Sequence, residues 1–266
     1  MSHQHDLSGE IDRYAYTNGL AKNSPTTKIF FALSSLIISG SSPTPIIPII
    51  IFIINTILLL SIAKIPAKFY FHLLEYPTLA VILSVLIIAL FFGFGETIAQ
   101  ISLPWFTWSI YQNGITMAIT TFFRVEGAIT CTFFLVLTTS MTDLFVTLRK
   151  IKIPKVVIEL SLLIYRYIFV FMEVSSKMNT AQSLRLGHSS AMRRIRSLAL
   201  LAGNLFIRTL EQGERTFTAM SARGYDGNIM LLEELPSPKK SAIIAIVLFD
   251  VVFAVVIFLL LYFGVV

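Results

Sequence analysis

The sequence has few of the residue combinations that enzymes use for catalysis or metal binding. Its single cysteine, Cys131, lies in an apolar run, which excludes an intrachain disulfide and a cysteine-based metal cluster. A Gly-x-x-x-x-Gly-Lys-Ser/Thr phosphate loop, a His-Glu-x-x-His motif and a Gly-x-Ser-x-Gly motif are all absent. The four histidines show no metal-ligand spacing within the apolar spans. The sequence therefore predicts a protein that is not an enzyme and carries no cofactor of its own.

Charge is scarce as well. Of the 266 residues, 14% are charged and 55% are hydrophobic, and the mean hydropathy is +0.78. A soluble domain of this size cannot cover so much apolar surface, so the composition predicts a polytopic membrane protein whose surroundings are a lipid bilayer rather than nucleic acid. The first 25 residues are polar. We therefore expect no cleavable signal peptide, and expect the first membrane helix to act as the targeting signal.

Five apolar segments are predicted to cross the membrane, which gives an all-α fold class. Their approximate ranges are 27–39, 46–63, 77–94, 110–139 and 242–261. The first is short, because a crossing needs about 20 residues, and the fourth is long enough to tilt. Residues 66–75 mix basic and aromatic side chains and predict a short interfacial helix. The polar stretch with Trp105 and Trp108 suits a membrane interface.

The distribution of basic residues predicts the orientation. Residues 141–240 carry 15 of the 21 Lys and Arg residues, and the linkers after the first and third spans carry none. Because positive loops stay in the cytoplasm, we predict a multi-pass protein of the cell membrane with a cytoplasmic N-terminus. The predicted domains are a cytoplasmic N-terminal segment (1–26), a membrane domain of four crossings (27–140), cytoplasmic coupling helices (141–240) and a final transmembrane helix (241–266).

Residues 156–172 are apolar enough for a sixth crossing. Glu159 and Arg166 interrupt them, however, and a sixth crossing would place the basic residues that follow outside the cell. We predict instead that they begin a cytoplasmic helix.

The N-terminal residues His3, His5 and Asp6 suit a divalent transition metal by ligand type. A frayed chain terminus explains them equally simply, and we favour that explanation.

Ionisable residues within membrane spans are the next candidates, because they are costly at bilayer depth and often mark function. Arg124 and Glu126 lie near the middle of the fourth span, and Asp250 lies in the last. Two residues apart on a helix, Arg124 and Glu126 point in different directions. We favour a structural role, with Arg124 bonded to Asp250 or to a carbonyl of another span, over a substrate or proton path.

Two long helices are predicted in the basic region, and each ends near an arginine. Pro154 can begin the first helix and Gly187 can end it, while Gly224 or Gly227 can end the second. This places Arg185 and Arg223 in the last turns. One arginine there would simply complement the helix dipole, but two similar endings suggest two equivalent binding sites on a partner.

Gly203 and Gly213 lie inside the second predicted helix and weaken it. A close approach between helices at these two points is the compensation that we expect.

The stretch Ala219-Met220-Ser221-Ala222-Arg223-Gly224-Tyr225-Asp226-Gly227 resembles the T component of energy-coupling factor transporters, the cobalt type in particular. In that family two coupling helices end in Ala-Arg-Gly or Ala-Arg-Ser motifs that bind grooves in a pair of ATPases. Ala222-Arg223-Gly224 matches one motif. The other motif departs from the family pattern. Leucines replace the small residues on both sides of the arginine, in Leu184-Arg185-Leu186, and the glycine, Gly187, comes one position later than in the pattern. A weaker contribution from Arg185 is therefore expected.

The resemblance extends over most of the chain and implies a coupling function without catalysis. It implies two ATP-binding cassette ATPases as partners, which would hold ATP and Mg²⁺, and a separate substrate-binding membrane subunit, the S component, that captures Co²⁺ or Ni²⁺. Its partner-binding residues would be Arg185, Gly187, Ala222, Arg223 and Gly224. Two alternatives remain: an autonomous secondary transporter that uses Arg124, Glu126 and Asp250, and a membrane enzyme whose basic segment holds phosphates. Five unequal spans show none of the internal symmetry common in secondary transporters.

Overall fold

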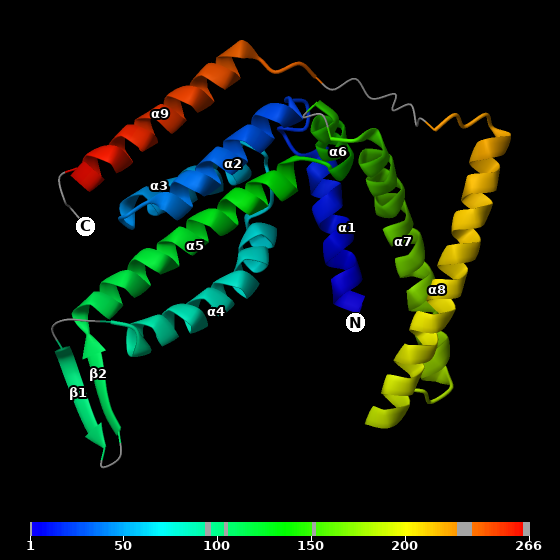
Figure 1. Cartoon of the computed structure of the whole chain (residues 1–266), viewed down its shortest axis with the longest axis horizontal. Coiled ribbons are helices and arrows are strands. Elements are labelled where there is room, and N and C mark those ends of the chain that lie inside the picture. Colours follow the sequence, from blue (N-terminus) through cyan, green and yellow to red (C-terminus); the bar gives the residue numbers. More distant parts are fainter. Residues whose placement is uncertain (1, 94–96, 104–105, 151–152, 228–235, 263–266) are drawn as a thin grey trace. The chain divides into compact units, whose positions relative to one another are not determined.

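The protein is almost entirely helical, as the sequence predicts (Figure 1). The computed structural model describes residues 2–93, 97–103, 106–150, 153–227 and 236–262, with side chains omitted for residues 2–8 and 97–110. The helices are α1 (Ser2–Thr17), α2 (Pro25–Ser41), α3 (Ile46–Ile57) with a π-helical turn (Leu58–Ile62), α4 (Ala67–Phe91), α5 (Gln112–Thr138), α6 (Met141–Lys150), α7 (Lys155–Leu184), α8 (Ala191–Ala222) and α9 (Lys240–Tyr262).

The chain divides into two compact units. The first consists of residues 1–143 and 235–266 and contains α1 to α5 and α9, and the second consists of residues 144–234 and contains α7 and α8. These divisions fall close to the predicted ends of the coupling segment at residues 141 and 240. The side of the membrane on which each unit lies stays a prediction.

Three of the described helices are long and apolar enough to cross a membrane. They are α4, α5 and α9. Helix α2 has 17 residues, which corresponds to about 26 Å and falls short of a hydrocarbon core of about 30 Å. The apolar helix Ile46–Ile62 is likewise below the length of a full span. Helix α7 is not among the three, and its place outside the membrane stays a prediction. The count of five crossings stays a prediction.

Two local predictions are wrong, and one element was not predicted. The N-terminal residues form helix α1 instead of a frayed terminus. The interfacial helix and the third span are one continuous helix, α4, with Pro77 inside it. Both halves lie against α5, at Tyr70 in the first half and at Ala89 in the second. The stretch before α5 forms an antiparallel hairpin, β1 (Thr97–Leu103) and β2 (Phe106–Tyr111), which is the one departure from an all-α fold among the described residues. Its β-branched and aromatic residues favour strands. Glu96 and Trp105 lie outside the described residues.

Helix α5 is the centre of the first unit, where it packs against α2, α3, α4 and α1 (Figure 1). Two clusters of buried apolar side chains line it. One includes Leu59, Tyr70, Phe134 and Leu137. The other joins Ile47 and Ile51 to Cys131, and apolar residues of α9 pack against it. This contact with α9 explains why the last helix belongs to the same unit although it follows the second one in sequence.

The α1–α2 turn closes the C-terminal end of α5 with polar side chains. Lys28 Nζ donates to the Thr138 carbonyl at 2.7 Å, and Asn18 Nδ2 lies 3.3 Å from the carbonyl oxygens of both Leu137 and Thr138. Both side chains are buried. A cation at this position also complements the negative end of the helix dipole. The contact anchors the start of the chain on the central helix.

The second unit is an antiparallel pair of helices with a very small core (Figure 1). Three hydrogen bonds at different points along the pair join α7, α8 and the residues just after them. They link Glu159 with Tyr225, Tyr167 with Thr216, and Gly187 with Ser197. Among the described residues of this unit, the buried ones are Thr147, Ile158 and Ser197. Most of the apolar surface of the pair is therefore open.

The expected close approach at Gly203 and Gly213 is wrong. A Cβ atom at either position would have no neighbouring atom within 4 Å. Both glycines lie in open stretches of α8, because α7 contacts α8 over a narrow line and leaves these positions free.

Candidate functional site

The end of α7 is a left-handed cap with two backbone hydrogen bonds. The Leu186 N–H donates to the Ser183 carbonyl at 3.0 Å, and the Gly187 N–H donates to the Gln182 carbonyl at 2.9 Å. Leu186 has a φ of 59°. These are the two bonds of a Schellman motif, in which Arg185 is the C-cap residue.

The end of α8 has the same construction. The Gly224 N–H donates to the Ser221 carbonyl and the Tyr225 N–H to the Met220 carbonyl, each at 3.0 Å. Gly224 has a φ of 80°, and Arg223 is the C-cap residue. Arg185 and Arg223 therefore occupy equivalent positions in two identical motifs, although the sequences around them differ.

The sequence prediction for Gly187 is wrong in one respect. Leu186, not Gly187, takes the left-handed conformation that ends α7. A Cβ atom on Gly187 would lie 2.5 Å from Ser197 Oγ and 2.9 Å from the Gln182 carbonyl oxygen. Gly187 is thus required by the close approach of Ser197 of α8 behind the cap, and it lies one residue after the left-handed position that glycine usually takes in this motif.

Leu186 is a strained residue at a candidate site. A left-handed backbone costs roughly 1–2 kcal/mol for a residue other than glycine. The Leu186 side chain is 68% exposed, and that of Leu184 is 81% exposed, so neither returns this energy through packing within the chain. Such strain often accompanies function. The hydrophobic periodicity of the sequence did not predict this strain, because the strain depends on which residue takes the positive φ.

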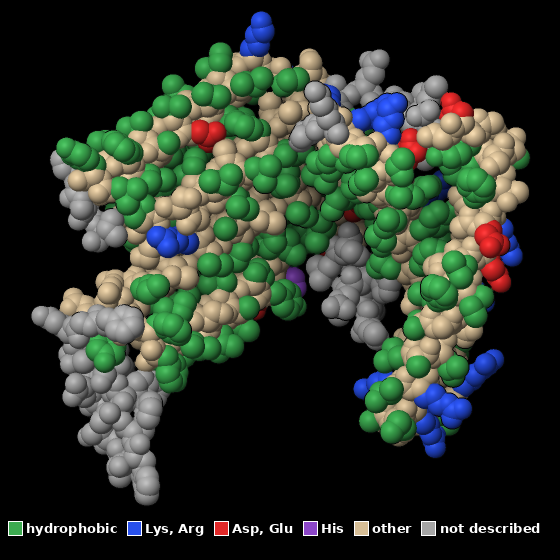
Figure 2. All heavy atoms as spheres, viewed as in Figure 1, with side chains coloured by type: hydrophobic (Ala, Val, Ile, Leu, Met, Phe, Trp, Pro, Cys, Tyr) green, Lys and Arg blue, Asp and Glu red, His purple; other side chains and the backbone are tan. Residues whose placement is uncertain are grey.

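The two arginines are exposed at opposite ends of α8. Neither guanidinium has a hydrogen bond or ion pair within the described part of the chain. The 32 residues of α8 lie between them, a span of about 48 Å at 1.5 Å per residue. Figure 2 shows further basic side chains gathered at the α7–α8 turn. The pair therefore presents two separated, cationic helix ends.

Tyr225 links the second cap to α7. Its hydroxyl donates to Glu159 Oε2 at 3.1 Å. The contact joins the residue directly after the cap to the first turns of α7, so it fixes where Arg223 lies on the helix pair. Tyr225 appears in the quoted motif, but the sequence gave no indication of its partner.

In the first unit, Arg124 has a backbone partner instead of a carboxylate. Its Nε donates to the Ser42 carbonyl at 2.6 Å, and its own carbonyl accepts from Ser39 Oγ at 3.2 Å. The carbonyl option of the sequence analysis is the one observed, and Asp250 as its partner is wrong. Ser42 follows the end of α2, where unsatisfied carbonyls are available.

The other two membrane carboxylates face different neighbours. Glu126 is buried and lies beside Thr78 of α4, whereas Asp250 of α9 lies beside Ser34 of α2. The three ionisable residues therefore lie beside three separate neighbours and do not converge.

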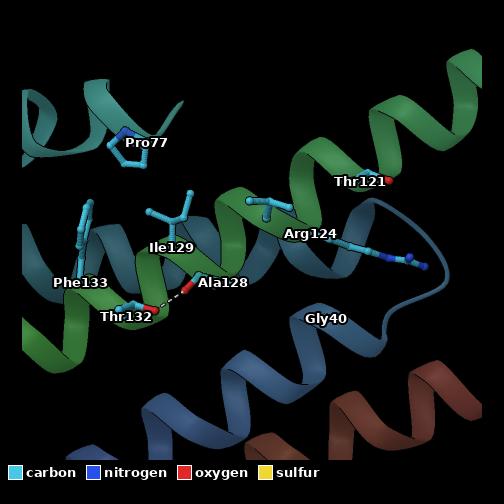
Figure 3. Close-up of a pocket in the computed structure, with 9 residues that line it drawn as sticks. Gly40, Pro77, Thr121, Arg124, Ala128, Ile129, Thr132 and Phe133 are labelled. Carbon is cyan, nitrogen blue, oxygen red and sulfur yellow. Dashed lines mark hydrogen bonds between the residues drawn. The ribbon is translucent and has the colours of Figure 1, made fainter. Parts of the chain in front are cut away.

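An open groove of about 490 Å³ lies between α5, Pro77 of α4 and Gly40 of α2. Arg124 is the one charged residue in its lining. Its side chain extends away from α5 toward the loop after α2 (Figure 3). The groove is therefore apolar, and it offers no carboxylate for a cation.

A charge swap tests the assignment of Arg124. We expect Arg124→Ala to lower stability by about 1.5–3 kcal/mol, the usual worth of a hydrogen bond to a charged group. The double variant Arg124→Asp with Asp250→Arg should be no more stable than the worse single variant, because the two side chains have different partners. Unfolding of the detergent-solubilised proteins measures both effects. Recovery of stability in the double variant would instead restore the Arg124–Asp250 pair.

A metal site is not evident in the described residues. No group of three or more His, Cys, Asp or Glu side chains there can hold a metal ion. His3, His5 and Asp6 lie on α1, but their side chains lie outside the described part of the chain, so their role stays a prediction.

Comparison with known proteins identifies the family. A family model described as "Cobalt transport protein", CbiQ, matches residues 17–233. An uncharacterized protein of Methanocaldococcus jannaschii is 41% identical over 91% of this chain and 90% of its own length. The energy-coupling factor transporter transmembrane protein EcfT of Exiguobacterium sibiricum is 30% identical over 79% of this chain and 82% of its own length.

The match to a third relative covers a smaller part of this chain. The cobalt transport protein CbiQ of Salmonella typhimurium is 32% identical over 50% of this chain and 60% of its own length. The family match covers both units of the structure, including α7, α8 and their two caps. Since the family model matches residues 17–233 and therefore includes both α7 and α8, the chain belongs to the CbiQ family of cobalt transport proteins.

Proposed function

We propose that this protein is the non-catalytic coupling subunit of an energy-coupling factor importer for cobalt or nickel. In this role it transmits the ATP-driven motion of two cytoplasmic ATP-binding cassette ATPases to a separate substrate-binding membrane subunit. ATP and Mg²⁺ would be held by the ATPases, and this chain would hold no cofactor. The N-terminus and the α7–α8 pair would both lie in the cytoplasm.

The observation that carries the proposal is the pair of equivalent arginine caps on an otherwise unburied helix pair. Large apolar side chains remain exposed along both helices, among them Leu160, Ile164, Met192, Phe206 and Phe217. A patch of this kind marks an interaction surface. The exposed guanidiniums at its ends can form charge-assisted hydrogen bonds with acidic or carbonyl groups. Two rigid helices joined end to end would then transmit the displacement of the bound partners.

The alternative of an autonomous secondary transporter has little support. Arg124, Glu126 and Asp250 face Ser42, Thr78 and Ser34 respectively. A proton or ion path would need these groups to converge on one site. The absence of a phosphate loop and of the usual catalytic motifs from the sequence likewise favours a subunit that leaves ATP hydrolysis to its partners.

Binding measurements test the proposal. The purified chain should bind neither ATP nor Co²⁺ tightly in isothermal titration, whereas it should retain a pair of ATPases when purified from its native membrane. Failure to recover any ATPase would contradict the coupling role. Submicromolar Co²⁺ binding that disappears when residues 1–6 are removed would instead assign a metal site to His3, His5 and Asp6.

A further inference from the structure

The two ends of the α7–α8 pair have the same backbone motif but different side chains beside the arginine. At the α8 end, Arg223 lies between Ala222 and Gly224, so its direct neighbours are small. At the α7 end, Arg185 lies between Leu184 and Leu186, which are 81% and 68% exposed. Since both ends are Schellman motifs of the same register, the difference lies in the side chains alone.

We propose that Leu184 and Leu186 are the apolar anchors of the α7 end, and that this end binds an ATPase surface with apolar walls around an acceptor for Arg185. This inference rests on the proposed coupling function and extends it. The two ends are thus unequal: the α7 end contributes apolar burial directly beside its arginine, whereas the residues that flank Arg223 are too small to do so.

The position of Leu186 supports an anchoring role. The left-handed position is one that glycine occupies without strain, and glycine does occupy it at the α8 end. A leucine at this position makes the cap less stable than a glycine would. Its side chain is exposed at the end of the helix instead of packing within the chain. Its exposure, combined with the strain, points to contact with something outside the chain.

The surroundings of this end indicate a cationic and apolar surface. Met192 and Ile195 on the first turns of α8 are also exposed, and Arg193 and Arg194 lie between them in the sequence. Figure 2 shows hydrophobic and basic side chains side by side at this end of the pair. A complementary partner therefore needs apolar side chains and acceptors of negative character. The proposed function makes an ATPase the occupant of this surface, and an anionic membrane surface is the competing explanation.

The double variant Leu184→Ala with Leu186→Gly separates anchoring from capping. It gives the α7 end the sequence Ala-Arg-Gly, the same as the α8 end, while both arginines stay in place. Because glycine relieves the left-handed strain, the helix cap should be at least as stable as before. The affinity for the ATPase pair should nevertheless fall by roughly ten- to a hundredfold, as expected when one or two leucine side chains lose their burial at an interface.

A matched control removes exposed apolar side chains from the membrane unit. Leu79→Ala with Leu83→Ala truncates two exposed residues of α4, a helix that is long and apolar enough to cross the membrane. This variant should bind the ATPases with less than a threefold change. Affinity of the full-length chain is measured by titration with the purified ATPase pair, and folding by thermal unfolding of each variant.

The measurement is made both in detergent and in nanodiscs that contain anionic phospholipid. Unchanged affinity of the Leu184→Ala, Leu186→Gly variant, beside a wild type that binds, overturns the anchoring proposal alone. A loss confined to the nanodiscs also overturns it, since the leucines would then contact the membrane surface. A wild type that binds no ATPase in either setting contradicts the proposed function itself.

Discussion

Replacement of both cap arginines, Arg185→Glu with Arg223→Glu, is expected to abolish recovery of an ATPase pair while the membrane unit stays folded. Each guanidinium is exposed and without a partner in the described part of the chain. Removing a buried interfacial charge from a complex can cost ~2–5 kcal/mol of affinity, roughly thirty-fold or more for each site. Reversing the charge adds repulsion from an acidic acceptor. A pull-down with the ATPase pair measures the effect.

The single variants Arg185→Glu and Arg223→Glu should lower recovery of the ATPase pair to a similar extent. The sequence favours a weaker effect of Arg185, because the residues around it depart from the family motif. The structure removes that reason, since Arg185 and Arg223 are C-cap residues of the same motif. The apolar flanks of Arg185 add to its interface instead of degrading it.

Arg208→Glu is the charge-matched control, because Arg208 is an exposed residue in the middle of α8. It should leave ATPase recovery nearly unchanged. If the cap arginines only complemented the helix dipole, their loss would lower helix stability by less than ~1 kcal/mol and would leave binding nearly intact. Undiminished recovery with the double variant would therefore identify both residues as ordinary helix ends.

Gly127→Val is expected to destabilise the membrane unit by about 3 kcal/mol, at the upper end of the usual effect of overpacking. Gly127 is buried where α5 meets α2 and α3. A Cβ atom there would collide with Ser39 Oγ and lie 3.2 Å from the Pro48 carbonyl oxygen. Ser39 can move aside only by giving up its hydrogen bond to the Arg124 carbonyl, and the backbone at Pro48 cannot move independently of α3.

Two other glycines serve as controls for this prediction. A Cβ atom on Gly40 of α2 or on Gly203 of α8 would meet no atom within 4 Å. Gly203→Ala should stabilise α8 by roughly 0.5–1 kcal/mol through its higher helix propensity, and Gly40→Ala should be neutral or mildly stabilising. Unfolding in detergent compares all three variants. A Gly127→Val protein as stable as the wild type would show that α5 does not approach its neighbours this closely.

The sequence by itself determined the class of protein and the positions of its long apolar helices. Long apolar runs can be satisfied in a bilayer only by helices whose backbone groups pair internally, so composition and spacing predicted α5 and α9 closely. The motif around Arg223 likewise located the second helix end, because glycine is the residue that most often takes the left-handed position of a helix cap. These features depend on residues that are near one another in the chain.

Tertiary structure decided the features that depend on distant residues. Arg124 was placed correctly in a span, but its partner is a carbonyl more than 80 residues away, and charge alone favoured Asp250. Gly127, Lys28 and Asn18 gave no sequence signal, because their importance comes from the helices that approach them. The equivalence of Arg185 and Arg223 was hidden by unlike neighbours. It became visible only in the backbone, since hydrogen bonds and a positive φ, not side-chain identity, define the cap.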